Sequence, residues 1–398
     1  MSATAETLRR LRLPRVRVPG ADRFARFYAR WVEAGRDRPA GYLLLVATVA
    51  VLNVVGTVMI LSASSVQSLA NYGSAWYFFE RQLMWTLFGV VAFVVVARID
   101  YHRWQRLMVP LLVVAGVLLT VVLVPGIGIV AYGSRRWLGV GSWRVQPSEI
   151  AKLALLVFAA DVLTRREHEL HDWRRVLRPI LLVFLVFGLL VMREPDLDST
   201  IVLALIVAGV LLMGGVRARH LGTVFGGGIA ATALLAVAAP YRRARVFTYL
   251  HPWKDASNTG YQIAQSLIAL GSGGWSGVGL GAGRSKWLFL PNAHNDFIFA
   301  VIGEELGLVG TLLVIGLFFA FAVVGIRAAA RAPDRFGMLL ASGVTVWVVG
   351  QAIINIGAVI GLLPVSGIPL PFVSFGGSAL LFTMAATGIL GNVARQAT

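Results

Sequence analysis

The sequence predicts an all-α integral membrane protein with about ten transmembrane helices and a large extracellular loop between the seventh and the eighth. Composition is the first observation, because 57% of the 398 residues are hydrophobic and only 14% are charged, as in chains that cross a bilayer many times. The apolar runs are continuous, which disfavours the alternating strands of a membrane β-barrel. One long polar segment, residues 241–296, separates two late apolar runs and forms the predicted loop.

Each predicted helix is an apolar run that can cross a hydrocarbon core of about 30 Å. Several of the runs are short and would depend on tilt or on flanking residues. All of them belong to one predicted membrane domain, residues 41–395. The predicted spans lie near residues 41–63, 82–98, 107–125, 149–163, 179–193, 200–215, 221–240, 297–325, 337–361 and 377–393.

The distribution of basic residues predicts the orientation. Ten spans place both termini on the same side, and 24 of the 36 Lys and Arg residues lie on that side against 11 on the other. Because Lys and Arg gather in cytoplasmic loops, we expect both termini in the cytoplasm. Residues 1–40 hold ten arginines without an apolar stretch, so they are expected to be a basic cytoplasmic tail that attracts membrane lipid, not a signal peptide.

The charge and the cysteine count exclude several classes of function. The net charge of +17 follows from the topology, so no nucleic-acid partner is expected. With no cysteine in the chain, disulfides, thiolate metal sites and cysteine catalysis are excluded. His168 and His171 are one residue too close for the metalloprotease motif. No metal site is therefore predicted.

Two of the four segments predicted to face outward carry clusters of charge. The first contains Arg135 and Arg136, followed by Glu149 and Lys152, which are three residues apart on one helix and close enough to pair. That pair has a structural and a functional interpretation. The second segment, Arg193–Asp198, includes Asp196 and precedes a predicted helix, so helix capping competes with a role in binding.

The third outward segment holds Lys286, His294 and Asp296 ahead of an apolar helix. A carboxylate at the mouth of a membrane span is costly to place there, which makes Asp296 a candidate functional residue. We expect a short amphipathic helix over residues 260–270. The glycine-rich run 271–283 lacks the Walker pattern, and we expect it to allow tight turns and close backbone approach to a ligand.

The fourth outward segment, residues 363–377, is rich in Pro and Gly and contains Ser366 and Ser374. Non-helical backbone at membrane depth is tolerated where it is buried in protein or lines a cavity, so the segment predicts a cavity. Glu304 and Glu305 lie within the next span, and we expect either that one of them faces this cavity or that both bond to neighbouring helices.

These residues suit an amphiphile with an anionic head group. Arg135, Arg136, Arg243 and Lys286 could hold phosphate oxygens, and a divalent cation could assist them. Asp296 could act as a general base toward a sugar hydroxyl. From the residues alone, a lipid-phosphate transferase and a transporter both remain open.

Four motifs in order give the chain a close resemblance to the shape, elongation, division and sporulation (SEDS) family, over everything except the N-terminal tail. They are GSRRWLGVGSWRVQPSEIAK, EPDLDST, GYQIAQSLIALGSGGWSGVGLGAGRSKWLFLPNAHNDFIFAVIGEELG and NIGAVIGLLPVSGIPLPFVSFGGSAL. The resemblance implies a ten-helix peptidoglycan glycosyltransferase that polymerises lipid II into glycan strands outside the bacterial cytoplasmic membrane. It also implies a class B penicillin-binding transpeptidase as partner. The wording of the late motifs is closer to division-type than to elongation-type members.

The same resemblance assigns roles to single residues. Asp296 matches the essential acid, the base that activates the acceptor's hydroxyl for an inverting attack on the donor sugar. Lys286 matches the lysine of the same motif, and the remaining matches have roles in substrate binding or helix packing: Arg135, Arg136, Glu149, Lys152, Asp196 and the loop from Ser366 to Gly377. Asp198 departs from the family, where glycine is usual. A lipid II flippase and a non-catalytic scaffold are the rival functions; no internal repeat of the kind that transporters show is visible.

Overall fold

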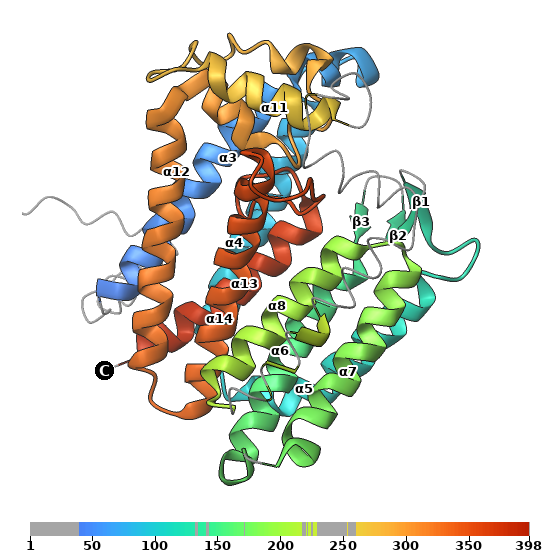
Figure 1. Ribbon diagram of the computed structural model, residues 1–398, viewed down its shortest axis with the longest axis vertical. Helices are drawn as coiled ribbons and strands as arrows, with labels where there is room; N and C mark the ends of the chain where they lie inside the picture. Colours follow the sequence, from blue (N-terminus) through green and yellow to red (C-terminus); the bar gives the residue numbers. More distant parts are fainter. Residues whose placement is uncertain are drawn as a thin grey trace, which may run out of the picture. The chain divides into compact units, whose positions relative to one another are not determined.

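The computed structural model describes residues 40–131, 134–140, 143–170, 172–216, 220, 222–223, 226–228, 253 and 260–397. The predicted tail, most of the seventh span and Arg243 lie outside these residues. The helices belong to the compact unit Gly41–Thr398. Long helices dominate it (Figure 1). They are α3 (Ala40–Tyr72), α4 (Tyr77–Arg98), α5 (Arg103–Val121), α6 (Pro147–Arg165), α7 (Trp173–Arg193), α8 (Leu197–Met213), α12 (Ile298–Ala330), α13 (Arg335–Val359) and α14 (Gly377–Gln396).

These helices confirm the predicted fold class. Within the described residues, seven are long and apolar enough to cross a membrane. The other two are α8, which is shorter, and α6, which carries Glu149, Lys152 and Asp161 along its length. Each of the nine helices overlaps one predicted span. The remaining prediction, the seventh span near 221–240, lies mostly outside the described residues.

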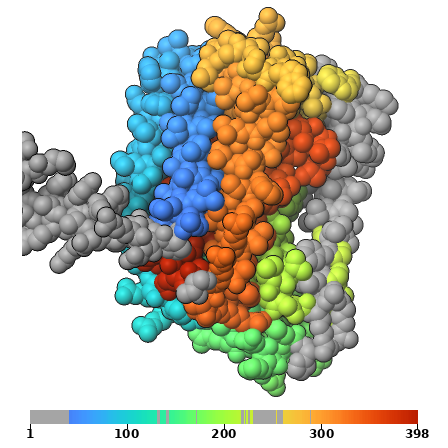
Figure 2. All heavy atoms as spheres, turned by 90° about the vertical axis from the view of Figure 1, so that its left-hand side faces the viewer, coloured from blue at the N-terminus to red at the C-terminus, as the bar shows by residue number. Residues whose placement is uncertain are grey.

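Two helices are much longer than a bilayer requires. Both α3 and α12 contain 33 residues, which at about 1.5 Å per residue is roughly 50 Å and exceeds the hydrocarbon core. They lie side by side on one face (Figure 2), where the Ser62 hydroxyl donates hydrogen bonds of 2.7 Å to the Glu305 carboxylate. Helix α12 changes direction at Gly307, whose φ of 66° is in the left-handed region that glycine tolerates.

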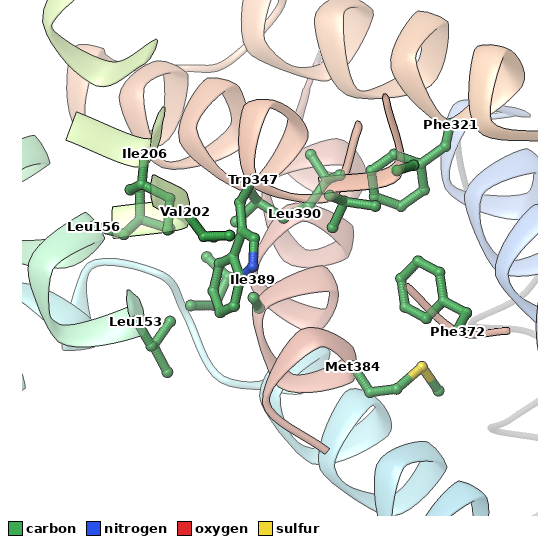
Figure 3. Packing of buried hydrophobic residues seen from close by; sticks show 14 of the residues in the cluster. Leu153, Leu156, Val202, Ile206, Phe321, Trp347, Phe372, Met384, Ile389 and Leu390 are labelled. Carbon is green, nitrogen blue, oxygen red and sulfur yellow. The ribbon is translucent and has the colours of Figure 1, made fainter. Parts of the chain in front are cut away.

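The core lies along α13 and α14. Helix α13 contacts α6, α8, α12 and α14, while α14 packs along α4. Trp347 of α13 is fully buried, with Leu156 and Ile206 close by (Figure 3). Large apolar side chains on α4, α5 and α7 are exposed instead, as expected of helix faces turned to lipid.

A small antiparallel sheet is the element that the sequence did not predict. It consists of β1 (Ile129–Ala131), β2 (Ser134–Val140) and β3 (Trp143–Val145), in the order β1-β2-β3, within the first outward segment. The predicted amphipathic helix is confirmed as α11 (Tyr261–Ser272), and a short π-helix, η3, covers Ser285–Phe289.

Candidate active site

The segment 363–377, called the Pro/Gly loop from here on, lies directly against the backbone that carries Asp296. The Ser374 hydroxyl donates a 2.6 Å hydrogen bond to the Asn295 carbonyl, and the Phe375 N–H donates a 3.0 Å bond to the His294 carbonyl. The loop in turn depends on Ser374, whose hydroxyl accepts from Leu370 N–H at 2.8 Å. Two of the predicted outward segments therefore form one structural unit at the start of α12.

Asn355 of α13 also joins the Asp296 segment to the Pro/Gly loop. Its side-chain amide donates 2.8 Å hydrogen bonds to the carbonyls of Asp296 and Ile368. Asn355 is almost fully buried, whereas the Asp296 side chain is partly exposed. The backbone of Asp296 is thus fixed to the core, although the residue itself is partly exposed.

Asp198 brings a third segment to this point. Its Oδ2 atom accepts a 3.1 Å hydrogen bond from the exposed Gly367 N–H. A Cβ placed on Gly367 would lie 2.9 Å from that oxygen and 3.9 Å from Asp296 Oδ2. The two carboxylates therefore approach the same glycine, and Asp198 was not among the predicted site residues.

His294 is buried beside this unit. Its ring lies 4.5 Å from that of Phe78 and 5.8 Å from that of Phe375, and among the described residues its Nδ1 atom has no hydrogen-bond partner. Burial lowers the pKa of His294 to about 4. The imidazole is therefore neutral at neutral pH, and it packs as an aromatic ring next to Asp296.

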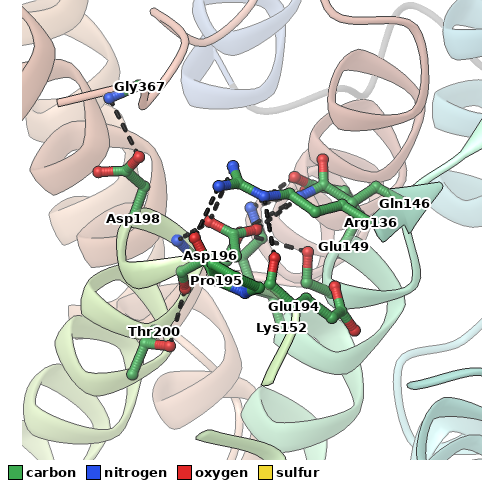
Figure 4. Close-up of polar contacts among 12 residues, drawn as sticks. Arg136, Gln146, Glu149, Lys152, Glu194, Pro195, Asp196, Asp198, Thr200 and Gly367 are labelled. Atoms are coloured by element: carbon green, nitrogen blue, oxygen red, sulfur yellow. Dashed lines mark hydrogen bonds and ion pairs between the residues drawn. The ribbon is translucent and has the colours of Figure 1, made fainter. Parts of the chain in front are cut away.

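Arg136 and Asp196 connect the first two of the segments predicted to face outward (Figure 4). Arg136 donates hydrogen bonds to the Glu194 and Pro195 carbonyls at 3.3 and 2.7 Å, and its Nη1 lies 3.7 Å from Asp196 Oδ1. Asp196 caps α8 by accepting from the Ser199 N–H, and it also accepts from Gln146 at 2.8 Å. The capping interpretation of Asp196 is confirmed, and a role in binding would be additional to it.

Glu194 is a buried acid that the sequence analysis did not single out. Neither of its carboxylate oxygens has a hydrogen-bond partner in the described part of the chain. Burial, then the charge of Asp196, raises its pKa to about 8, although the Arg136 guanidinium acts in the opposite direction. The side chain is therefore mostly protonated at pH 7.

Glu149 and Lys152 form an ion pair inside the bundle. The Lys152 Nζ atom lies 2.7 Å from Glu149 Oε2 and 2.8 Å from Oε1, and both side chains are almost completely buried. The ammonium also lies 5.4 Å from the centre of the Trp347 ring. Because the two charges face each other within the core, this geometry favours the structural interpretation of the pair.

The remaining predicted residues are spread around the site. Arg135 donates a 3.1 Å hydrogen bond to the Leu123 carbonyl, and Lys286 donates to the Gly281 carbonyl. The Ser366 hydroxyl is enclosed and has no partner within the described ranges. Arg243 lies outside them. The structure therefore groups His294, Asp296 and Ser374 closely.

Glu304 and Glu305 hold the glycine-rich run. Glu304 accepts from the N–H groups of Arg284 and Ser285 at 2.7 and 3.2 Å, and Glu305 accepts from Gly281 N–H at 3.1 Å. These bonds tie α12 to the loop and, through Ser62, to α3, which supports the alternative that the two acids bond to neighbouring elements.

Some glycines of the run approach α12 closely. A Cβ on Gly273 would overlap the Gly303 carbonyl, and one on Gly277 would overlap the Glu305 carbonyl. The predicted close backbone approach is present, but its partner is protein backbone. No group of three or more His, Asp or Glu side chains in the described part of the chain is placed to hold a metal ion.

Comparison with known proteins places this architecture in a family. A family model described as "Cell cycle protein", covering FtsW, RodA and SpoVE, matches residues 42–398. The chain belongs to the SEDS family. A "Probable peptidoglycan glycosyltransferase FtsW" from Mycobacterium tuberculosis is 43% identical over 378 residues, 95% of this chain and 72% of the relative. Stage V sporulation protein E of Bacillus subtilis is 41% identical, over 89% of this chain and 96% of that protein.

Solved structures of SEDS proteins have the same fold. One chain belongs to a structure described as "Structural coordination of polymerization and crosslinking by a peptidoglycan synthase complex"; it gives a TM-score of 0.74 at 28% identity, over 89% of this chain and 97% of that chain. The rod shape determining protein RodA of Thermus thermophilus gives a TM-score of 0.65 at 27% identity, over 89% and 96%. The likeness extends across nearly the whole of both structures.

Proposed function

We propose that this SEDS protein is a peptidoglycan glycosyltransferase that polymerises lipid II into glycan strands at the outer face of the bacterial cytoplasmic membrane. Relatives at 41 to 44% identity support it, among them probable peptidoglycan glycosyltransferases named FtsW. The observation that supports the mechanism is the placement of Asp296, whose carbonyl is bound by Asn355 while the residue is partly exposed.

In the proposed reaction Asp296 is the general base. Its carboxylate takes the proton of the acceptor sugar's hydroxyl, and the hydroxyl oxygen attacks the anomeric carbon of the donor. The bond from that carbon to the pyrophosphate oxygen breaks, the polyprenyl pyrophosphate leaves, and the configuration inverts. General-base catalysis of this kind contributes roughly 10²–10⁴ in rate. No proton donor is needed, because the leaving group is already an anion.

Basic side chains would hold the pyrophosphates. Lys286, Arg135 and Arg243 are proposed for this role, with Arg136 shared between the substrate and the Asp196 segment. The close packing of Glu149 with Lys152 supports a role for the pair in shaping the site from within. A divalent cation could act together with the basic residues at the pyrophosphates.

The orientation follows from the charge distribution. With both termini in the cytoplasm, the end of the bundle that carries Asp296, Asp198 and the Pro/Gly loop faces outward. We propose a division role, which the FtsW relatives support; an elongation role is the alternative, because RodA shares the fold.

A transpeptidase of the class B penicillin-binding type is the proposed partner. The structure of a peptidoglycan synthase complex contains a chain of the same fold. No lysine of this chain follows a serine by three positions, so the Ser-x-x-Lys motif of such enzymes is absent. Cross-linking would therefore have to come from a second protein.

Purified protein mixed with lipid II in detergent micelles separates the proposal from its rivals. A polymerase yields glycan strands on a gel without any bilayer, and the Asp296→Ala variant yields few or none. A flippase yields no strands in micelles. If wild type with its transpeptidase partner makes no strands, or if Asp296→Ala makes as many as wild type, the proposed reaction is wrong.

A further inference from the structure

Asp198 occupies a position that the proposed chemistry does not yet use. It is the second residue of α8, where the helix N-terminus favours a negative charge. Its Oδ2 atom accepts the Gly367 N–H at 3.1 Å (Figure 4). Because this bond joins α8 to a backbone N–H of an exposed residue, the contact is suited to holding an exposed stretch of loop.

Gly367 lies next to both acids. The position that a Cβ would take is 2.9 Å from Asp198 Oδ2 and 3.9 Å from Asp296 Oδ2. The two carboxylate oxygens can therefore be no farther apart than the sum of these distances. Glycine at 367 leaves this space free of side chain, and the residue is exposed.

The backbone on both sides of Gly367 is held by different helices. Asn355 of α13 binds the Ile368 carbonyl and, with the same amide, the Asp296 carbonyl. Asp198 of α8 binds the Gly367 N–H. Residues 367 and 368 are thereby held between α8 and α13, and their position relative to Asp296 depends on both contacts.

We propose that Asp198 is a positioning residue for Asp296. Through the Gly367 N–H it holds the loop at the distance that leaves room for the acceptor hydroxyl beside the Asp296 carboxylate, and Gly367 keeps that room open. The identity of the acceptor rests on the proposed function, whereas the holding of the loop does not. A misplacement of about 1 Å near reacting groups can cost up to about 10²-fold in rate, so the contact affects turnover more than substrate affinity.

Two substitutions at position 198 distinguish the effect of losing the hydrogen bond from the effect of disturbing the fold. Asp198→Ala removes the acceptor, and we expect kcat for lipid II polymerisation to fall about tenfold with KM unchanged within about twofold. Asp198→Asn keeps an acceptor oxygen of the same reach, and we expect kcat within about threefold of wild type. Thermal midpoints of both variants in detergent verify that the helices are intact.

Two glycine substitutions test the space itself. Gly367→Ala would put a methyl group 2.9 Å from Asp198 Oδ2 and in the gap beside Asp296, and we expect it to lower kcat at least as much as Asp198→Ala. Gly316→Ala is the control outside the site, because its added methyl on α12 meets nothing within 4 Å; we expect polymerisation at the wild-type rate.

Hydrogen exchange measures the holding of the loop without any substrate. In a peptic fragment that spans Gly367, we expect faster exchange for Asp198→Ala and wild-type exchange for Asp198→Asn. Wild-type exchange in Asp198→Ala would overturn the proposal, and so would faster exchange with an unchanged kcat. If wild-type protein makes no polymer at all, the proposed function fails, and the exchange experiment still decides whether Asp198 holds the loop.

Discussion

The hydroxyl of Ser374 donates a 2.6 Å hydrogen bond to the carbonyl of Asn295, the residue before Asp296. The same hydroxyl accepts from the Leu370 N–H, so one side chain fixes a turn of the Pro/Gly loop and attaches it to the site. This bond explains how a loop that is not helical keeps a constant relation to the start of α12.

Replacement of Ser374 by Ala is expected to release the loop. It leaves the buried Leu370 N–H and the Asn295 carbonyl without the partner they have now, at a cost of about 1–3 kcal/mol in the free energy of unfolding. We expect a lower thermal midpoint and slower lipid II polymerisation. Thr387→Ala serves as a control, because its hydroxyl bonds only to a carbonyl within α14; equal losses in both variants would contradict the account.

The ion pair of Glu149 and Lys152 predicts a rescue. Lys152→Met leaves a buried carboxylate without its cation, and breaking such a pair costs about 3–5 kcal/mol. The double variant Glu149→Leu with Lys152→Met replaces both charges by apolar groups and should recover most of the thermal stability. We also expect it to polymerise lipid II. A stable but inactive double variant would show that polymerisation needs the charged pair itself and not only the packing around it.

Glu194 predicts how stability depends on pH. Its pKa is about 8 in the folded chain against an ordinary value of 4.5. Between these values the folded state keeps a proton that the unfolded state has lost, so the contribution of Glu194 to stability falls as the pH rises from 4.5 to 8. The thermal midpoint of Glu194→Gln, measured relative to that of wild type, should therefore be higher at pH 8 than at pH 5. Parallel curves for the two proteins would contradict the raised pKa.

Because the glycine-rich run contacts α12, alanine substitutions at two of its glycines are expected to have different effects. Gly277 has a φ of 80°, and a methyl group there would overlap the Glu305 carbonyl. We expect Gly277→Ala to detach the run and to increase its cleavage in limited proteolysis. In Gly271→Ala, by contrast, the added methyl meets nothing within 4 Å, and alanine improves the helix propensity of α11 by about 1 kcal/mol. Equal proteolysis of the two variants would contradict this packing.

The sequence was sufficient to predict the helices, because their apolar runs must satisfy all backbone groups internally in lipid. It underestimated their length where polar residues extend a helix beyond the membrane, as in the last turns of α3 up to Tyr72. Sheet strands β1 to β3 were missed because they are short and lie among glycines and arginines. Antiparallel pairing between such segments is decided by contacts that no local pattern shows.

At the site, the sequence indicated candidate residues but not their hydrogen-bond partners. Asp296, His294 and Ser374 lie close together, and each lies beside a helix end in a segment predicted to face outward. The partners of Glu304 and Glu305 are backbone N–H groups, which every residue carries and which a sequence cannot distinguish. The contact between Asp198 and Gly367 joins positions 169 residues apart, and only the packing of α8 against α13 brings them together.

The most direct test of the central claim is the initial rate of lipid II polymerisation by Asp296→Asn compared with wild type. Asparagine has the same shape but cannot take a proton, so the account predicts a fall in rate of about 10²-fold or more with an unchanged thermal midpoint. A variant that polymerises lipid II at the wild-type rate would show that Asp296 is not the base.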